Sequence, residues 1–154
     1  MQNFSTRLAM AGPFATAAAS AARGDLIEIL DGPASVEVHR LGADVVYDLQ
    51  VSCEAPIELH SHAASLIIIP VRVVAEQSAA HFPDFEGSLE LTNTGGRTFE
   101  VVLEGDFEER RSGVGERAAF SVRMEDVLEA LLRLLGDRIE THVRTVESTT
   151  GIPL

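Results

Sequence analysis

The sequence predicts an α+β fold in which an antiparallel β-sheet packs one face against a long C-terminal α-helix. Between Val36 and Phe107, apolar residues alternate with polar ones at the period of two that half-buried strands show. From Phe120 to Val143, the apolar residues follow the helical repeat instead. The segment Asn93-Thr94-Gly95-Gly96 lies between two alternating runs and is a hairpin signal, which favours antiparallel neighbours with one solvated face.

Length and composition limit what the chain can be. With 154 residues, 45% of them hydrophobic and 23% charged, it fits one compact domain over residues 1–154, and we expect a flexible tail over 146–154. The net charge of −12 disfavours nucleic acid and anionic membrane surfaces as partners. All 12 basic residues are Arg, which excludes Schiff-base and P-loop lysine chemistry. A single cysteine, Cys53, excludes an intrachain disulfide and a cysteine-based zinc cluster.

The N-terminal elements are expected to be one strand and two short helices. Phe4–Met10 reads as a strand, and the residues from Phe14 to Ala21 place apolar side chains on one helical face. Asp25 is expected to cap a second short helix that ends before Gly32-Pro33.

This N-terminal region also faintly resembles a secretory signal. Its core is mostly Ala, Thr and Ser with Gly12-Pro13 inside, so the strand and helix are the better interpretation. No run of 18 apolar residues exists, and no membrane insertion is expected. We therefore expect a cytoplasmic protein.

The central strands differ in how many of their faces are apolar. Residues 45–53 alternate cleanly, as do residues 99–107, whereas Leu66–Ala75 is apolar on both faces and is expected to be partly buried on both sides. The C-terminal helix should span some 20 residues and lie across the apolar face of the sheet. Gly136 within it indicates a kink or the close approach of another backbone.

This order of elements resembles the helix-grip fold of the START-like and polyketide cyclase (SRPBCC) superfamily. Phe82, Phe85, Gly87, Leu89 and Leu91 match an F-x-x-F/L-x-G-x-L-x-L strand of small bacterial members, and the stretch GPFATAAASAARGDLIEILDGP resembles their helical pair. The resemblance covers nearly the whole chain and implies a curved sheet that grips the helix. It permits ligand binding, or an enzyme of the cyclase, dehydratase or hydrolase kind. The helical pair is short and lacks the aromatic residues often present, which implies a small or open cavity.

Two groups of histidines and acids are candidates for chemistry. In an extended segment Glu58, His60 and His62 would share one side and could bind zinc weakly. They lie in the expected connection between residues 55 and 64, so we favour an exposed polar turn and expect no metal and no cofactor. His81, near Asp84 and Glu86, could act as a general base beside a cavity mouth, although a solvated His is the simpler interpretation.

Three single residues stand out on the strands. Arg72 interrupts an apolar strand and is expected to pair with Asp48 or Glu90 on the outer face, the alternative being an anionic ligand or partner. Tyr47 is expected to pack in the core, with its hydroxyl available to orient a ligand in a cavity. Cys53 is interpreted as a buried small hydrophobe.

Binding of a small apolar ligand is the first functional hypothesis, because many aliphatic residues point inward and few bulky ones fill the space between helix and sheet. The cavity is expected near the Phe82–Phe85 end. Its expected ligand-binding residues are Tyr47, Val71, His81, Phe82, Phe85, Phe99, Leu103, Leu128, Leu131 and Leu135. An assembly protein that forms a homodimer or partner complex ranks second and catalysis third, so whether the chain is an enzyme stays open at this point.

Overall fold

The computed structural model describes residues 2–40, 43–60, 65–75, 83–107 and 124–150. These residues form an α+β fold, as the sequence predicts. The elements in chain order are β1 (Gln2–Ala11), α1 (Phe14–Arg23), α2 (Asp25–Leu30), β2 (Gly32–Arg40), β3 (Ala43–Cys53), β4 (Ile57–His60), β5 (Ser65–Ala75), β6 (Phe85–Gly95), β7 (Thr98–Phe107) and α3 (Met124–Thr150). None of these helices is long and apolar enough to cross a membrane.

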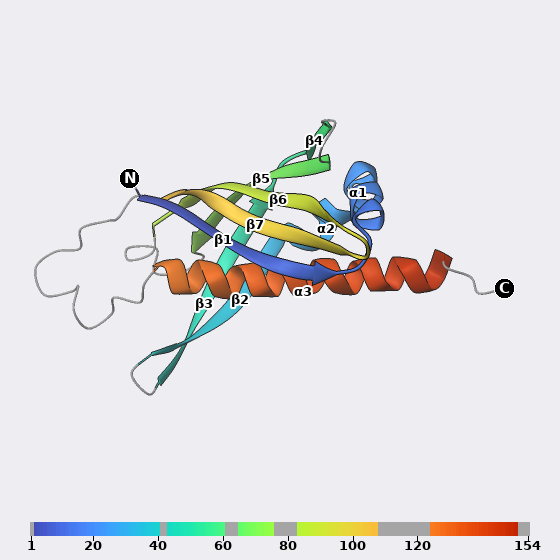
Figure 1. The fold of residues 1–154 in the computed structure, drawn as a ribbon. Coiled ribbons are helices and arrows are strands. Elements are labelled where there is room, and N and C mark those ends of the chain that lie inside the picture. The colour runs from blue at the N-terminus through green and yellow to red at the C-terminus, as the bar shows by residue number, and fades with distance from the viewer. Residues whose placement is uncertain (1, 41–42, 61–64, 76–82, 108–123, 151–154) are drawn as a thin grey trace, which may run out of the picture.

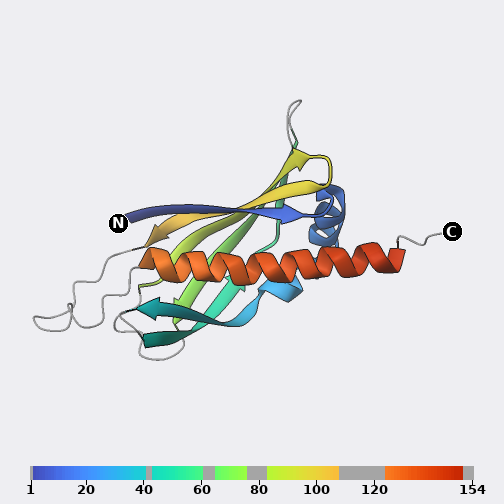
Figure 2. The ribbon, with the colours of Figure 1, turned by 60° about the horizontal axis from the view of Figure 1, so that its bottom comes forward.

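The strands form one curved antiparallel sheet in the order β1-β7-β6-β5-β3-β2, and β4 pairs with β5 beside this path. α3 lies along the concave face between the two edge strands β1 and β2, while α1 and α2 sit at one end of the sheet (Figures 1 and 2). Because it packs against both edge strands, the one helix closes the open side of the sheet.

A pair of glycines allows β6 and β7 to approach each other closely. Gly87 of β6 and Gly105 of β7 lie directly opposite each other. A Cβ atom at Gly87 would collide with the carbonyl oxygen of Glu104, and the ring of Phe85 occupies the space beside Gly105. β6 and β7 therefore lie closer together at this point than two residues with side chains would permit. Glycine is used in this way in curved sheets.

The core confirms the predicted alternation. Most alternate residues of β5, β6 and β7 are buried, and so is one stripe of α3. The buried residues of these elements include Ile67, Ile69, Val71, Val73, Phe85, Leu89, Leu91, Phe99, Val101, Leu103, Phe107, Leu128, Leu131, Leu135, Ile139 and Val143. A Cβ at Gly136 would lie 2.9 Å from Leu8 Cδ2, so this glycine allows the close approach of β1 to α3.

The predicted hairpin is also present between β6 and β7. Gly95 and Gly96 have φ angles of 94° and 63°, in the left-handed region that glycine adopts without steric cost. Two successive residues with positive φ suit the right-handed twist of the flanking strands.

Three local predictions need correction. Residues 57–60 form strand β4 rather than part of an irregular connection, because their backbone pairs with β5, although the side chains of Ile57, Glu58 and Leu59 are exposed. Gly24, in a left-handed conformation, is the N-cap of α2, while the Asp25 carboxylate pairs with Arg23 at 3.0 Å. α3 is 27 residues long rather than some 20, and it continues to Thr150.

Candidate functional site

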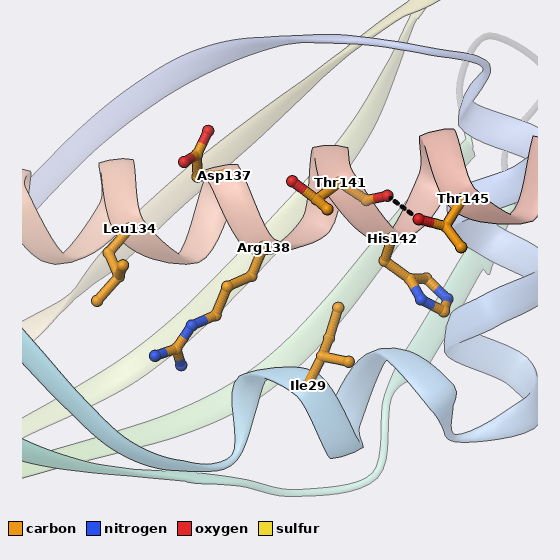
Figure 3. Close-up of a pocket in the computed structure, with 7 residues that line it drawn as sticks. All are labelled: Ile29, Leu134, Asp137, Arg138, Thr141, His142 and Thr145. Atoms are coloured by element: carbon orange, nitrogen blue, oxygen red, sulfur yellow. Dashed lines mark hydrogen bonds between the residues drawn. The ribbon is translucent and has the colours of Figure 1, made fainter.

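A groove of about 350 Å³ lies between α2 and α3, at the end of the sheet where the helices meet. We call it the α2–α3 groove. Its walls come from one residue of α2 and six of α3, shown in Figure 3. The lining residues are Ile29, Leu134, Asp137, Arg138, Thr141, His142 and Thr145.

The helical repeat places the main wall of the groove. Leu134, Arg138 and His142 are four residues apart on α3, so their side chains lie above one another on one face. Figure 3 shows them pointing toward α2, from which Ile29 points back, whereas Asp137 points to the other side of α3. The groove therefore has two aliphatic side chains, one guanidinium and one imidazole on its facing walls.

The short helix α2 is held in place by burial rather than by capping. Leu26 and Leu30 have no exposed surface, which fixes α2 against the core. Ile29 lies on the neighbouring face and is only partly buried. Anchoring through two leucines thus leaves this isoleucine at the surface of the groove.

Hydrogen bonds hold the two polar side chains of the wall. Arg138 Nη2 donates to the carbonyl oxygen of Pro33 at 3.4 Å, which ties the guanidinium to the start of β2. His142 Nε2 lies 3.0 Å from Oγ of Ser20, and Arg23 Nη2 donates to the same hydroxyl at 3.4 Å. Since Ser20 is fully buried, these bonds satisfy a polar group of the core and connect α1 to α3.

The predicted ligand-binding residues of the interior pack as core in this structure. Five of them have no accessible surface, so they contact no space large enough for a water molecule; they are Phe85, Phe99, Leu103, Leu128 and Leu131. Val71 and Leu135 are buried as well, and Tyr47 is partly buried against the same core. His81 and Phe82 lie outside the described residues.

Arg72 has the structural role that the sequence suggests, with other acids than expected. It lies opposite Glu86 on the convex face, 3.7 Å from that carboxylate, and its Nη2 donates to Asp84 Oδ2 at 3.0 Å. Asp48 instead accepts a hydrogen bond from the hydroxyl of Ser35 at 2.6 Å. Asp84, considered above as a partner of His81, is therefore engaged with the guanidinium of Arg72.

The histidine cluster predicted around Glu58 falls partly outside the structure. Glu58 is exposed on β4. His62 and the side chain of His60 lie outside the described residues. Within the part of the chain that the structure describes, no group of three His, Cys, Asp or Glu side chains is arranged to hold a metal ion.

Cys53 is partly buried, in surroundings that disfavour ionisation of its thiol. Burial and the nearby Asp31 carboxylate raise the pKa of the Cys53 thiol to about 12. The thiolate, which is the nucleophilic form, is therefore scarce at neutral pH. Cys53 serves as a small packing residue, as the sequence suggests.

The groove residues were not among the predicted site residues. Arg138 and Asp137 read in the sequence as part of the solvated outer face of the helix. The four-residue spacing of Leu134, Arg138 and His142 was available as a signal. It becomes a wall only because α2, far away in the sequence, packs beside this stripe.

Neither a protein family model nor a curated protein matches the sequence. Solved structures resemble the fold over nearly the full length. A conserved protein from Geobacillus kaustophilus has 12% identity, a TM-score of 0.49, and coverage of 94% of this chain and 96% of its own. A START superfamily protein from Mycobacterium smegmatis has 14% identity, a TM-score of 0.42 and coverages of 94% and 98%. The Zhui aromatase/cyclase from Streptomyces sp. R1128 has 14% identity, a TM-score of 0.38 and coverages of 98% and 99%.

The element order and strand pairing of the chain itself define its architecture. Two short helices follow the first strand, a curved antiparallel sheet comes next, and a long C-terminal helix lies in its concave face. This arrangement is the one implied by the resemblance to START-like proteins. The chain thus has the helix-grip α+β fold.

Proposed function

We propose that this protein binds a small, largely apolar molecule and that the α2–α3 groove is the binding site. The observation that carries the proposal is the convergence of Ile29 and Leu134 with a few polar side chains around a hollow of about 350 Å³. Binding sites for small molecules are concave, fall in a range of roughly 300–1,000 Å³, and combine apolar walls with a few polar groups.

The interior between α3 and the sheet is a less favourable location for the same function. A ligand among Phe99, Leu103 and Leu131 would have to displace side chains that have no accessible surface. Close-packed protein interiors resist such displacement. The groove takes a ligand without separating α3 from the sheet, and for this reason we favour it.

Methyl-resolved NMR during titration with octanol tests the location. We expect the methyl signals of Ile29 and Leu134 to shift first and to saturate together, because these side chains face the groove. Leu131, in the core below α3, serves as the internal reference. Shifts at Leu131 with none at Ile29 would place the ligand in the interior and refute the groove as the site.

A second candidate function is association with another protein chain, and an exposed apolar cluster favours it. Ile57 and Leu59 of β4 are 51% and 49% exposed. They lie opposite Ile68 and Leu66 of β5, so the four side chains share the convex face. Contiguous exposed apolar side chains of this kind are common at protein interfaces.

Light scattering after size exclusion tests self-association through this cluster. If the cluster forms a homodimer, Ile57→Ser should shift the protein toward monomer. Val46→Ser is the matched control, because Val46 is 59% exposed at a different place on the sheet. A wild-type protein that stays monomeric at high concentration would refute the homodimer.

Catalysis is the least supported function. The serine hydroxyl that contacts a histidine at the groove is Ser20, 3.0 Å from His142 Nε2. Ser20 has no exposed surface, so a substrate could not reach its oxygen for nucleophilic attack. The pair is better explained as a connection between α1 and α3.

A further inference from the structure

Arg138 has no carboxylate partner among the residues that the structure describes, in a protein of net charge −12. Other described arginines, such as Arg72 and Arg144, are paired with acids. Among the residues that the structure describes, Arg138 forms no ion pair although it is only partly exposed and lines the α2–α3 groove. The single acid among the groove residues, Asp137, points away from α2 in Figure 3. A guanidinium placed in this way complements an anion inside the groove.

The hydrogen-bonding capacity of Arg138 is only partly used. A guanidinium has five N–H donors, and the bond to the Pro33 carbonyl oxygen uses one of them. That bond also restricts the side chain, so less conformational entropy is lost when a ligand binds. A planar carboxylate accepts two parallel bonds from such a fork.

The apolar part of the groove adjoins this cation. Leu134 precedes Arg138 by one helical turn, and Figure 3 shows Ile29 facing the stretch of α3 between Arg138 and His142. A ligand with its charged end on Arg138 can therefore place an aliphatic or ring body against Ile29 and Leu134. The net charge of −12 disfavours a dianion such as a phosphate monoester, for which one arginine supplies too little compensation.

We infer that the α2–α3 groove binds a small amphipathic monocarboxylate, with the carboxylate held by Arg138 and the apolar body held by Ile29 and Leu134. This inference rests on the proposed function, because it names the chemical class of the ligand for the same groove. It makes Arg138 the residue that determines specificity for the headgroup.

Isothermal titration with octanoate, octanol and octylamine at neutral pH tests the inference. These probes share one apolar chain and differ in the charge of the headgroup. We expect octanoate to bind about tenfold or more tightly than octanol, as for a charge-assisted hydrogen-bonded pair, and octylamine to bind most weakly. Arg138→Gln should reduce octanoate binding to the level of octanol, and Arg138→Lys should retain part of the preference because it keeps the charge without the fork.

Arg133→Gln is the matched control, since Arg133 is an exposed arginine of the same helix outside the groove. It should leave the preference for octanoate unchanged. Arg138 also donates to the carbonyl oxygen of Pro33, so its replacement could disturb the start of β2 as well as ligand binding. A measurement on the wild-type protein avoids this ambiguity. Addition of octanoate should shift the side-chain Nε–H signal of Arg138 in NMR and leave that of Arg133 in place.

The outcomes separate the inference from the proposed function. If octanol and octanoate bind equally and Arg138→Gln changes neither, the carboxylate is refuted while the groove still binds apolar molecules. If octylamine binds most tightly, the assigned charge is wrong. If none of the three probes binds, the proposed function fails and the inference fails with it.

Discussion

Replacing one leucine of α3 by tryptophan distinguishes a packed interior from a ligand cavity. Leu131 is central on the buried stripe of α3 and has no exposed surface. Its neighbours on that stripe, Leu128 and Leu135, are 0% and 1% exposed. The indole of Leu131→Trp therefore has no empty space to enter and must displace its neighbours.

The expected cost follows from this packing. Overpacking a dense core typically reduces the free energy of unfolding by about 1–3 kcal/mol. For a domain of this size, each kcal/mol lowers the melting temperature by roughly 2–4 °C. Truncation at the same site, Leu131→Ala, should cost more, about 2–5 kcal/mol, because it leaves a cavity.

Leu134→Trp is the paired variant, one turn away on the groove wall. Leu134 is partly exposed and lines the α2–α3 groove, so the larger ring extends into the groove and solvent. Its stability should stay within about 0.5 kcal/mol of wild type, as for most surface substitutions. Binding of octanol or octanoate should be lost, because the ring fills the site.

Thermal and urea unfolding, followed by ligand titration of each folded variant, measure both effects. We expect Leu131→Trp to be destabilised with ligand binding retained, and Leu134→Trp to be stable with binding lost. The reverse pattern would refute the reasoning: a Leu131→Trp protein that melts at the wild-type temperature and no longer binds ligand would have a cavity beneath α3.

Three further predictions concern the sheet. Burial, and then the charge of Glu104, raise the pKa of Glu90 above its ordinary 4.5, so the ionised carboxylate disfavours the folded state. Glu90→Gln should therefore raise the melting temperature at pH 7. The gain should shrink as the pH falls through the raised pKa, because Glu90 of the wild type is then protonated as well. An equal gain at all pH values would contradict this reasoning. Alkylation of Cys53 by iodoacetamide should be slow in the folded protein, because the pKa of its thiol is about 12 and little thiolate is present at neutral pH. Its rate should keep rising by about tenfold per pH unit through pH 9 and 10, and a rate that levels off near pH 9 would show a normal thiol. Gly87→Ala should lower the free energy of unfolding by about 3 kcal/mol or more, the upper end of the range for overpacking, because the added Cβ would collide with the backbone of β7. Urea unfolding measures this loss. The control Ser88→Ala, on the outer face, should leave the free energy of unfolding nearly unchanged.

Much of the fold could be predicted from the sequence because it depends on short-range patterns. Alternation at a period of two is set by backbone geometry, and it identified β5 and β7 and the faces they bury. The turn at Gly95-Gly96 was readable because few other residues adopt two successive positive φ angles. The exposed strand β4 was missed because its four residues owe their conformation to pairing with β5 rather than to burial.

The groove was not readable in the same way. Leu134, Arg138 and His142 form a recognisable stripe on α3, but a helix face with one leucine, one arginine and one histidine is typical of a solvated surface. Ile29 faces this stripe only because Leu26 and Leu30 anchor α2 against the core. These residues lie more than a hundred positions before the stripe in the chain.

The sequence by itself determined the class of elements, their order and the faces that they bury, because these follow from local geometry and the separation of apolar from polar side chains. The tertiary structure alone decided that Phe99, Leu103 and Leu131 are fully buried, and that Arg138 lines the α2–α3 groove without an acidic partner among the described residues. The physical reason is that packing density and charge pairing depend on contacts between segments distant in the chain, and such contacts leave no periodic trace in the sequence.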